Sequence, residues 1–146
     1  MAGLEDLYKE IIVDHYKNPR NQGSLPTPPA VEEQGTNPYC GDEVTLFIQV
    51  EDGVVADVAV DGRGCSISQA SLSMMSEAVK GKSVDEARVL IEDFKGMMTG
   101  DELAPADVMK KGELAALTGV RKFPDRIKCA ILSWNTLGQA LDKSED

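Results

Sequence analysis

The sequence is short of positive charge, of histidine and cysteine, and of long apolar runs. Its 15 lysines and arginines are outnumbered by 25 aspartates and glutamates, so the formal net charge is −10. Proteins that bind nucleic acid or anionic lipid need a basic surface for the phosphates. No apolar run approaches the ~20 residues that span a bilayer. These shortages argue against a partner made of nucleic acid and against a membrane protein.

The N-terminal segment and the number of cysteines indicate the cellular compartment in which the protein resides. Residues 1–6 are acidic and lack the apolar core of a secretory signal peptide. The three cysteines are an odd number, which does not close a disulfide framework. We therefore expect the protein to reside in the cytoplasm, where thiols stay reduced.

Length and composition are those of one soluble domain. The chain has 146 residues, of which 42% are hydrophobic and 27% are charged. A chain of this length can bury a sizeable core without disulfides. We expect a single domain over residues 1–146.

The first third of the chain predicts a helix, a loop and a hairpin. Helical spacing of apolar residues begins near Leu4 and should end near Asn18, because Pro19 disfavours helix in the residue before it. Residues 44–51 and 54–61 have the character of strands, and the Asp52-Gly53 pair between them is a strong hairpin signal. A third strand is expected around residues 30–35.

The rest of the chain predicts helices. A helical stripe runs over residues 67–78, and Ser83 with Glu86 forms a capping box that opens the next helix. A short helix is expected near Glu113, and a last helix begins near Pro124. The predicted fold class is α+β, a small antiparallel three-stranded sheet with helices packed on one face.

The cysteines lie at the ends of predicted elements. Cys40 precedes a strand, and Asp42 is two residues later, so both side chains can point to the same side. Cys65 stands at the start of a helix, where free N–H groups favour a thiolate. In an antiparallel hairpin these two regions are adjacent, and the last helix then needs only to cross that edge to supply Cys129.

Cys129 has an unusual place on its predicted helix. The apolar face is centred near Ile131 and Trp134, and Cys129 lies roughly 140° from that centre at 100° per residue. A cysteine that serves as a small hydrophobe should lie on the apolar face. We therefore expect Cys129 to lie off the buried face, beside Asp125, Arg126 and Ser133.

Three thiolates and a carboxylate suit a tetrahedral zinc ion, and they would also suit an iron–sulfur cluster. Two arginines, Arg126 and Arg63, could offset part of the remaining negative charge, with Lys128 a weaker candidate. The alternative for all three is an ordinary solvated base. The single histidine, His15, shares a face with apolar residues, and we expect it to be packed in the core or to lie at its rim.

The chain resembles the U-type iron–sulfur cluster assembly proteins, the IscU/SufU family, over nearly all of its length. Four segments carry the resemblance: residues 14–23 (DHYKNPRNQG), 37–42 (NPYCGD), 62–68 (GRGCSIS) and 126–129 (RIKC). The IscU branch has a histidine where Lys128 stands, and it has a Leu-Pro-Pro-Val-Lys motif that is missing here. It also has fewer residues between the second and third cysteines, so the chain is more similar to the SufU branch.

The resemblance to SufU implies a zinc ion held by Cys40, Asp42, Cys65 and Cys129. It also implies that sulfur is accepted from a SufS-type cysteine desulfurase and delivered toward a SufB-containing assembly complex. In this hypothesis the protein is a zinc-dependent sulfurtransferase. Cys40 takes the persulfide sulfur, and Arg126 partly compensates the negative charge of the site. Two alternatives remain open: a scaffold for a transient iron–sulfur cluster, and a structural zinc module that only binds a partner.

Overall fold

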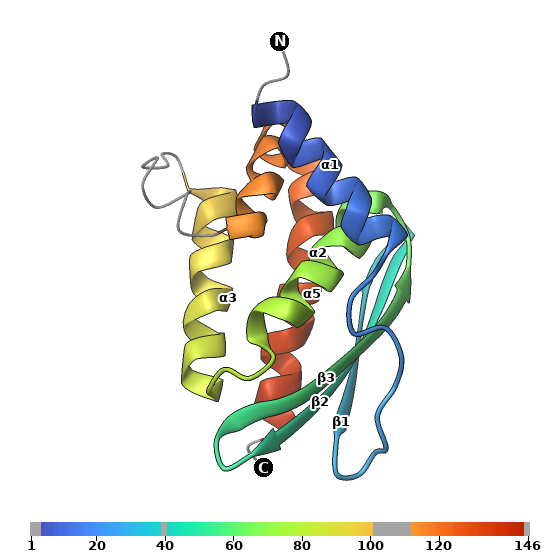
Figure 1. Ribbon diagram of the computed structural model, residues 1–146, viewed down its shortest axis with the longest axis vertical. Coiled ribbons are helices and arrows are strands. Elements are labelled where there is room, and N and C mark those ends of the chain that lie inside the picture. Colours follow the sequence, from blue (N-terminus) through green and yellow to red (C-terminus); the bar gives the residue numbers. More distant parts are fainter. Residues whose placement is uncertain (1–3, 39–40, 101–111, 145–146) are drawn as a thin grey trace.

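The computed structural model describes residues 4–38, 41–100 and 112–144 as helices packed on a small sheet (Figure 1). In chain order the elements are α1 (Leu4–Lys17), β1 (Val31–Asn37), β2 (Asp42–Glu51), β3 (Val54–Arg63), α2 (Ser66–Val79), α3 (Val84–Thr99), the 3₁₀ helix η1 (Gly112–Lys122) and α5 (Pro124–Ser144). The predicted α+β class with three antiparallel strands is confirmed. The short helix expected near Glu113 is the 3₁₀ helix η1.

The sheet has the order β1-β2-β3, so β2 lies in the middle. The predicted hairpin turn joins β2 to β3, and both of its residues have positive φ, 53° at Asp52 and 76° at Gly53. A two-residue turn of this kind matches the twist of the flanking strands. Both hairpin strands are two residues longer than predicted at the end away from the turn, which brings Asp42 and Arg63 into the sheet.

One face of the sheet carries the core. Along β2 the residues Val44, Leu46 and Ile48 are buried, while the residues between them are partly exposed, as the alternation of a strand with one covered face requires. Helices α2 and α5 pack against this face, and α1, α3 and η1 pack on those two helices (Figure 1). The ring of Trp134 in α5 stacks on Phe94 of α3 with centroids 4.5 Å apart.

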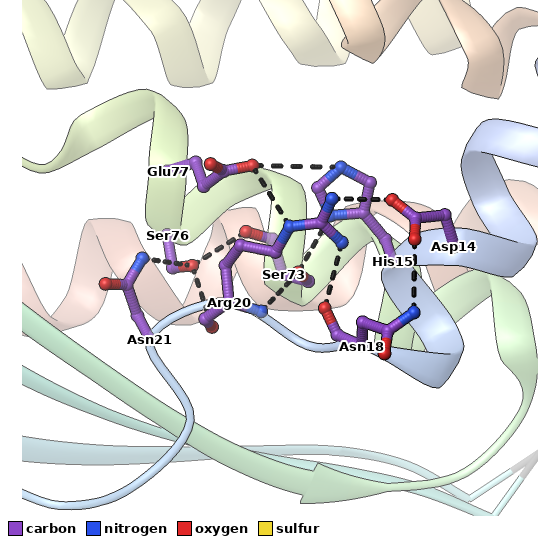
Figure 2. Close-up of polar contacts among 8 residues, drawn as sticks. All are labelled: Asp14, His15, Asn18, Arg20, Asn21, Ser73, Ser76 and Glu77. Atoms are coloured by element: carbon purple, nitrogen blue, oxygen red, sulfur yellow. Dashed lines mark hydrogen bonds and ion pairs between the residues drawn. The ribbon is translucent and has the colours of Figure 1, made fainter.

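A polar cluster that is buried at His15 and Ser73 and exposed at its carboxylates ties the end of α1 to α2 (Figure 2). We call Asp14, His15, Arg20, Ser73 and Glu77 the His15 cluster. His15 has no exposed surface, as predicted for a packed histidine, and its Nδ1 shares a hydrogen bond of 2.8 Å with Ser73 Oγ. The same oxygen accepts the backbone N–H of Arg20 at 2.9 Å. The Arg20 guanidinium contacts Asp14 at 2.6 Å and Glu77 at 3.8 Å, so charges of both signs alternate through the cluster.

The loop that follows α1 is held by this cluster and by the edge of the sheet. The backbone of β3 exchanges two hydrogen bonds with it, from Val60 N to Asn21 O and from Gly23 N to Val60 O, both at 2.9 Å. The Asn21 amide also donates to Ser76 on α2. The 14–23 segment thus protects an otherwise open sheet edge, where unpaired backbone groups would invite aggregation.

Helix α3 begins with the predicted capping box, in which Ser83 and Glu86 each accept a backbone N–H of the other. No helix among the described residues is at once long and apolar enough to cross a lipid bilayer.

Candidate metal centre

Three of the four predicted ligands converge at one end of the sheet. Asp42, Cys65 and Cys129 each offer a donor atom, and these atoms lie within 4.8 Å of one another. They come from three elements that are distant in the sequence: the start of β2, the residue before α2, and the second turn of α5. Cys40, the fourth predicted ligand, lies outside the described residues.

Asp42 is held in place by the backbone of the helix that follows the hairpin. Its Oδ1 accepts the backbone N–H of Cys65 at 2.8 Å, while its Oδ2 lies 3.8 Å from Cys65 Sγ. The side chain is almost fully buried, with 1% exposed. One carboxylate oxygen is therefore fixed by the main chain, and the other faces the sulfur.

Gly64 makes this approach possible. Its φ of +143° is disfavoured for residues with a side chain, and a Cβ placed there would collide with the Asp42 carboxylate. The residue before Cys65 must therefore be glycine for the carboxylate to reach the start of α2.

Cys65 is the N-cap of α2, but its side chain makes no capping hydrogen bond, so the sulfur is directed elsewhere. The residue is half-buried and lines an open groove of about 840 Å³ between α1, η1 and the start of α5. Phe123, 59% exposed, and Arg126 line the same groove. Of the two described cysteines, Cys65 is the one that a partner can approach from solvent.

The expectation that Cys129 lies off the buried face of its helix is wrong. Cys129 has no exposed surface, Ser133 one turn later is also fully buried, and Ile131 is only half-buried. The helical-wheel argument assumed one covered face, but α5 packs against β1 as well as against the helices. The second covered face is the one that carries Cys129.

Helices α2 and α5 are locked together next to the site. Ser71 Oγ donates to the carbonyl oxygen of Ala130 at 2.6 Å and accepts the indole N–H of Trp134 at 3.1 Å. Because Ala130 follows Cys129 directly, this hydrogen bond fixes the position of Cys129 along the axis of α5 relative to α2.

Asn37 is a site residue that sequence reasoning missed. It pairs with Asp42 across the sheet, is 8% exposed, and its side-chain Nδ2 donates to Cys129 Sγ at 3.6 Å. The available signal was its place in the NPYCGD segment, three residues before Cys40.

The donor set fits zinc. In a tetrahedral site with Zn–S bonds of ~2.3 Å and Zn–O bonds of about 2.0–2.2 Å, a sulfur and an oxygen ligand lie about 3.5–3.7 Å apart and two sulfurs about 3.8 Å apart. The 3.8 Å between Cys65 Sγ and Asp42 Oδ2 is close to the sulfur–oxygen spacing. The upper bound of 4.8 Å for all the pairs leaves about 1 Å of contraction, which side-chain rotation can supply. Two sulfurs and one carboxylate oxygen are also among the ligand types that zinc prefers.

The predicted basic residues take different positions. Arg126 is exposed and lines the groove that reaches Cys65, whereas Lys128 is exposed elsewhere on α5. Arg63, 81% exposed in its side chain, makes an ion pair of 2.5 Å with Glu43. This hydrogen bond to Glu43 raises the pKa of Arg63, and its guanidinium is thereby directed to the sheet surface.

The chain is similar to known proteins over nearly all of its length. Residues 7–130 match the family described as the NifU-like N-terminal domain. The chain is 45% identical over 144 residues to the zinc-dependent sulfurtransferase SufU of Bacillus subtilis, which covers 99% of this chain and 95% of the relative. It is 43% identical over 144 residues to the iron–sulfur cluster assembly scaffold protein IscU of Streptococcus pyogenes, covering 99% and 88% of the two chains.

A solved structure is similar over the same length. The putative iron–sulfur cluster assembly scaffold protein for the SUF system from Fervidobacterium islandicum superposes with a TM-score of 0.82 at 36% identity, covering 95% of this chain and 99% of that one. The chain therefore belongs to the NifU-like N-terminal domain family, in which its relatives are SufU and IscU proteins of iron–sulfur cluster assembly.

Proposed function

We propose that this protein is a zinc-dependent sulfur acceptor and carrier in iron–sulfur cluster assembly, with zinc held by Cys40, Asp42, Cys65 and Cys129. The observation that carries the proposal is the convergence of the three described donor atoms within 4.8 Å. The name of the Bacillus relative, a zinc-dependent sulfurtransferase, supports the choice of zinc and of sulfur transfer.

Cys40 is the fourth ligand in this proposal on grounds of chain length. Two residues of chain span at most ~7 Å, so the Cα of Cys40 is always within that distance of the Cα of Asp42. Bound zinc keeps its cysteine ligands deprotonated, which is the nucleophilic form of a thiol.

The sulfur step we propose conserves atoms and charge. A cysteine thiolate of this protein attacks the outer sulfur of a persulfide on the donor enzyme. A new S–S bond forms on the acceptor, the donor's S–S bond breaks, and the donor cysteine leaves as a thiolate with the electron pair. The proton of the persulfide stays with the transferred sulfur, so no oxidant or reductant is needed.

We assign the attack to Cys40. Cys129 is fully buried, and Cys65 is the N-cap of α2 with its backbone N–H bound to Asp42. Cys40 is the remaining cysteine, and in the sequence it is followed directly by Gly41. Arg126, which lines the groove beside Cys65, would offset negative charge as a donor approaches.

The donor in this proposal is a SufS-type cysteine desulfurase, and the sulfur passes on toward a SufB-containing assembly complex. The chemistry needs reduced thiols, which the cytoplasm maintains. Neither partner is a nucleic acid or a membrane, in keeping with a net charge of −10.

The proposal is tested with zinc-loaded protein, a SufS-type desulfurase and cysteine. We expect the protein to stimulate the desulfurase and to carry a persulfide that mass spectrometry places on Cys40. The Cys40→Ala variant should lose this stimulation, whereas Val54→Ala, exposed at the opposite end of the hairpin, should keep it. Stimulation that survives in Cys40→Ala would rule out Cys40 as the acceptor.

A second function, the assembly of an iron–sulfur cluster on the same ligands, is favoured by the scaffold names of the Streptococcus and Fervidobacterium relatives. Anaerobic purification separates the two. A colourless protein with about one zinc supports the carrier, whereas a brown protein with iron and acid-labile sulfide supports the scaffold.

A further inference from the structure

The two described cysteines of the metal centre have different polar surroundings. Cys129 Sγ is fully buried and receives the side-chain N–H of Asn37 at 3.6 Å. Cys65 Sγ faces the carboxylate of Asp42 and lines a groove that is open to solvent. One sulfur is therefore covered and hydrogen-bonded by an amide, and the other is approachable.

The position of Asn37 is set by close packing of β1 on α5. A Cβ at Gly35 would collide with the side chain of Thr136, so the strand lies against the helix at that level. Asn37 is two residues further along and points to the same side of the strand. Cys129 is seven residues before Thr136, about two helical turns along nearly the same face. The Gly35 contact therefore delivers the amide of Asn37 to the sulfur of Cys129.

The amide contact differs in kind from a second described contact of the Cys129 sulfur. As a thiol, Cys129 can donate to the carbonyl oxygen of Asp125, which lies 3.7 Å from Sγ. A metal-bound thiolate has no proton to donate there, whereas it still accepts the N–H of Asn37. A hydrogen bond to a thiolate withdraws electron density from sulfur, which weakens it as a nucleophile and holds its orientation toward a metal.

We propose that Asn37 is a positioning residue that keeps Cys129 bound to the metal throughout, an inference that rests on the proposed function. Incoming sulfur is thereby directed to another cysteine. The new S–S bond then forms on that other cysteine as the donor's S–S bond breaks, and the Cys129 sulfur stays unmodified throughout. Asn37 acts through Cys129 and touches neither the donor nor the transferred sulfur.

Cobalt(II) bound in place of zinc reports on the hydrogen bond without any sulfur transfer. Thiolate-to-cobalt charge-transfer bands move to lower energy when a sulfur loses a hydrogen bond. We expect this red shift in Asn37→Leu and in the smaller Asn37→Ala, with Asn37→Gln closer to the wild type because it keeps an amide. Zinc affinity should fall by about tenfold in the two variants without a donor, as is typical when the partner of a ligand is lost.

The matched control is Ser133→Ala, which removes a buried hydroxyl one turn after Cys129 that has no hydrogen-bond partner among the described residues. Its cobalt spectrum should equal that of the wild type. Should Asn37→Leu fail to fold, Asn37→Ala decides the question. Wild-type band positions in Asn37→Ala would overturn the proposal, and so would a folded Asn37→Ala that binds no cobalt.

Mapping of the persulfide tests the direction of sulfur transfer. After reaction with the desulfurase and cysteine, the wild type should carry no persulfide on Cys129, and Asn37→Ala should carry a measurable fraction there. A wild type that carries its persulfide on Cys129 would sink this inference and leave the sulfur-acceptor function standing. A wild type that accepts no sulfur would refute the proposed function, and the cobalt spectra would still judge the role of Asn37.

Discussion

The His15 cluster and the metal centre are both polar groups built partly on α2, but their charges are arranged differently and the carboxylates of the His15 cluster are half exposed. In the His15 cluster a guanidinium lies between two carboxylates, and Ser73 Oγ has both a ring nitrogen and a backbone N–H as partners (Figure 2). In the metal centre two sulfurs and a carboxylate, all anionic when deprotonated, lie within 4.8 Å of one another.

This difference separates a structural cluster from a binding site. Buried polar groups stabilise a fold when they satisfy one another, and they are costly when like charges gather. The His15 cluster supplies its own counter-charges, so it needs nothing from solution. The described donors at the metal centre need a cation to balance their negative charge when they are deprotonated. Substitutions in the metal centre should therefore change zinc affinity, and substitutions in the His15 cluster should change stability.

The largest effect is expected from Cys65→Ser. Loss of a ligand should weaken zinc binding by more than the roughly 100-fold that marks the upper range for residues that only support a ligand. The chain should keep its helical content, because the core packs without this sulfur. Competition with a chelating dye measures the affinity, and circular dichroism measures the fold. Zinc affinity equal to that of the wild type would place the ion elsewhere.

Gly64→Ala should weaken zinc binding by about 10-fold to 100-fold, because the added Cβ displaces the Asp42 carboxylate. Gly81→Ala is the control: this glycine also has positive φ, +85°, but its Cβ would meet no atom within 4 Å. Both variants should lose some thermal stability through backbone strain. Only Gly64→Ala should have a lower zinc affinity, and an equally lowered affinity in Gly81→Ala would contradict the role of the close contact.

Ser73→Ala should destabilise the fold by about 1–3 kcal/mol, since it leaves the Arg20 N–H and the His15 ring without their shared oxygen. Ser133→Ala is the matched substitution. It is also fully buried, but no described residue partners its hydroxyl, so its removal should leave stability unchanged or raised. Urea unfolding of the metal-free proteins measures both, and the zinc content of both should stay that of the wild type. Similar destabilisation by the two variants would refute this account of the cluster.

The smallest effect is expected from Asp14→Asn. The hydrogen bond from Arg20 holds the pKa of Asp14 below its model-compound value of 3.8. Because the folded-state pKa is lowered, the stabilisation is present at pH values above 3.8 and is lost as the pH falls through the folded-state value. Asp14→Asn should therefore be slightly less stable than the wild type at pH 7, with a urea midpoint that converges on the wild-type value in acid. A stability difference that does not shrink as the pH is lowered below 3.8 would contradict the ion pair.

What could be predicted from the sequence was mostly local. The Asp52-Gly53 turn and the Ser83–Glu86 capping box depend on a few adjacent residues, and the structure confirms both. The proximity of Asp42 and Cys65 follows from the hairpin, because the turn alone determines which strand ends meet.

The interactions of Cys129 and Asn37 could not be predicted in the same way. Burial of Cys129 arises from β1 packing on α5, a contact between residues about 90 positions apart, and helical periodicity carries no information about it. The amide of Asn37 reaches the sulfur only once the register of β1 on β2 and the close approach at Gly35 are known.

X-ray absorption at the zinc edge of the zinc-loaded protein tests the central claim most directly. The account predicts one zinc per chain with a coordination shell of three sulfurs at ~2.3 Å and one oxygen at about 2.0–2.2 Å. Protein that binds no stoichiometric zinc, or a shell made only of oxygen and nitrogen, would contradict the assignment of Asp42, Cys65 and Cys129 as ligands.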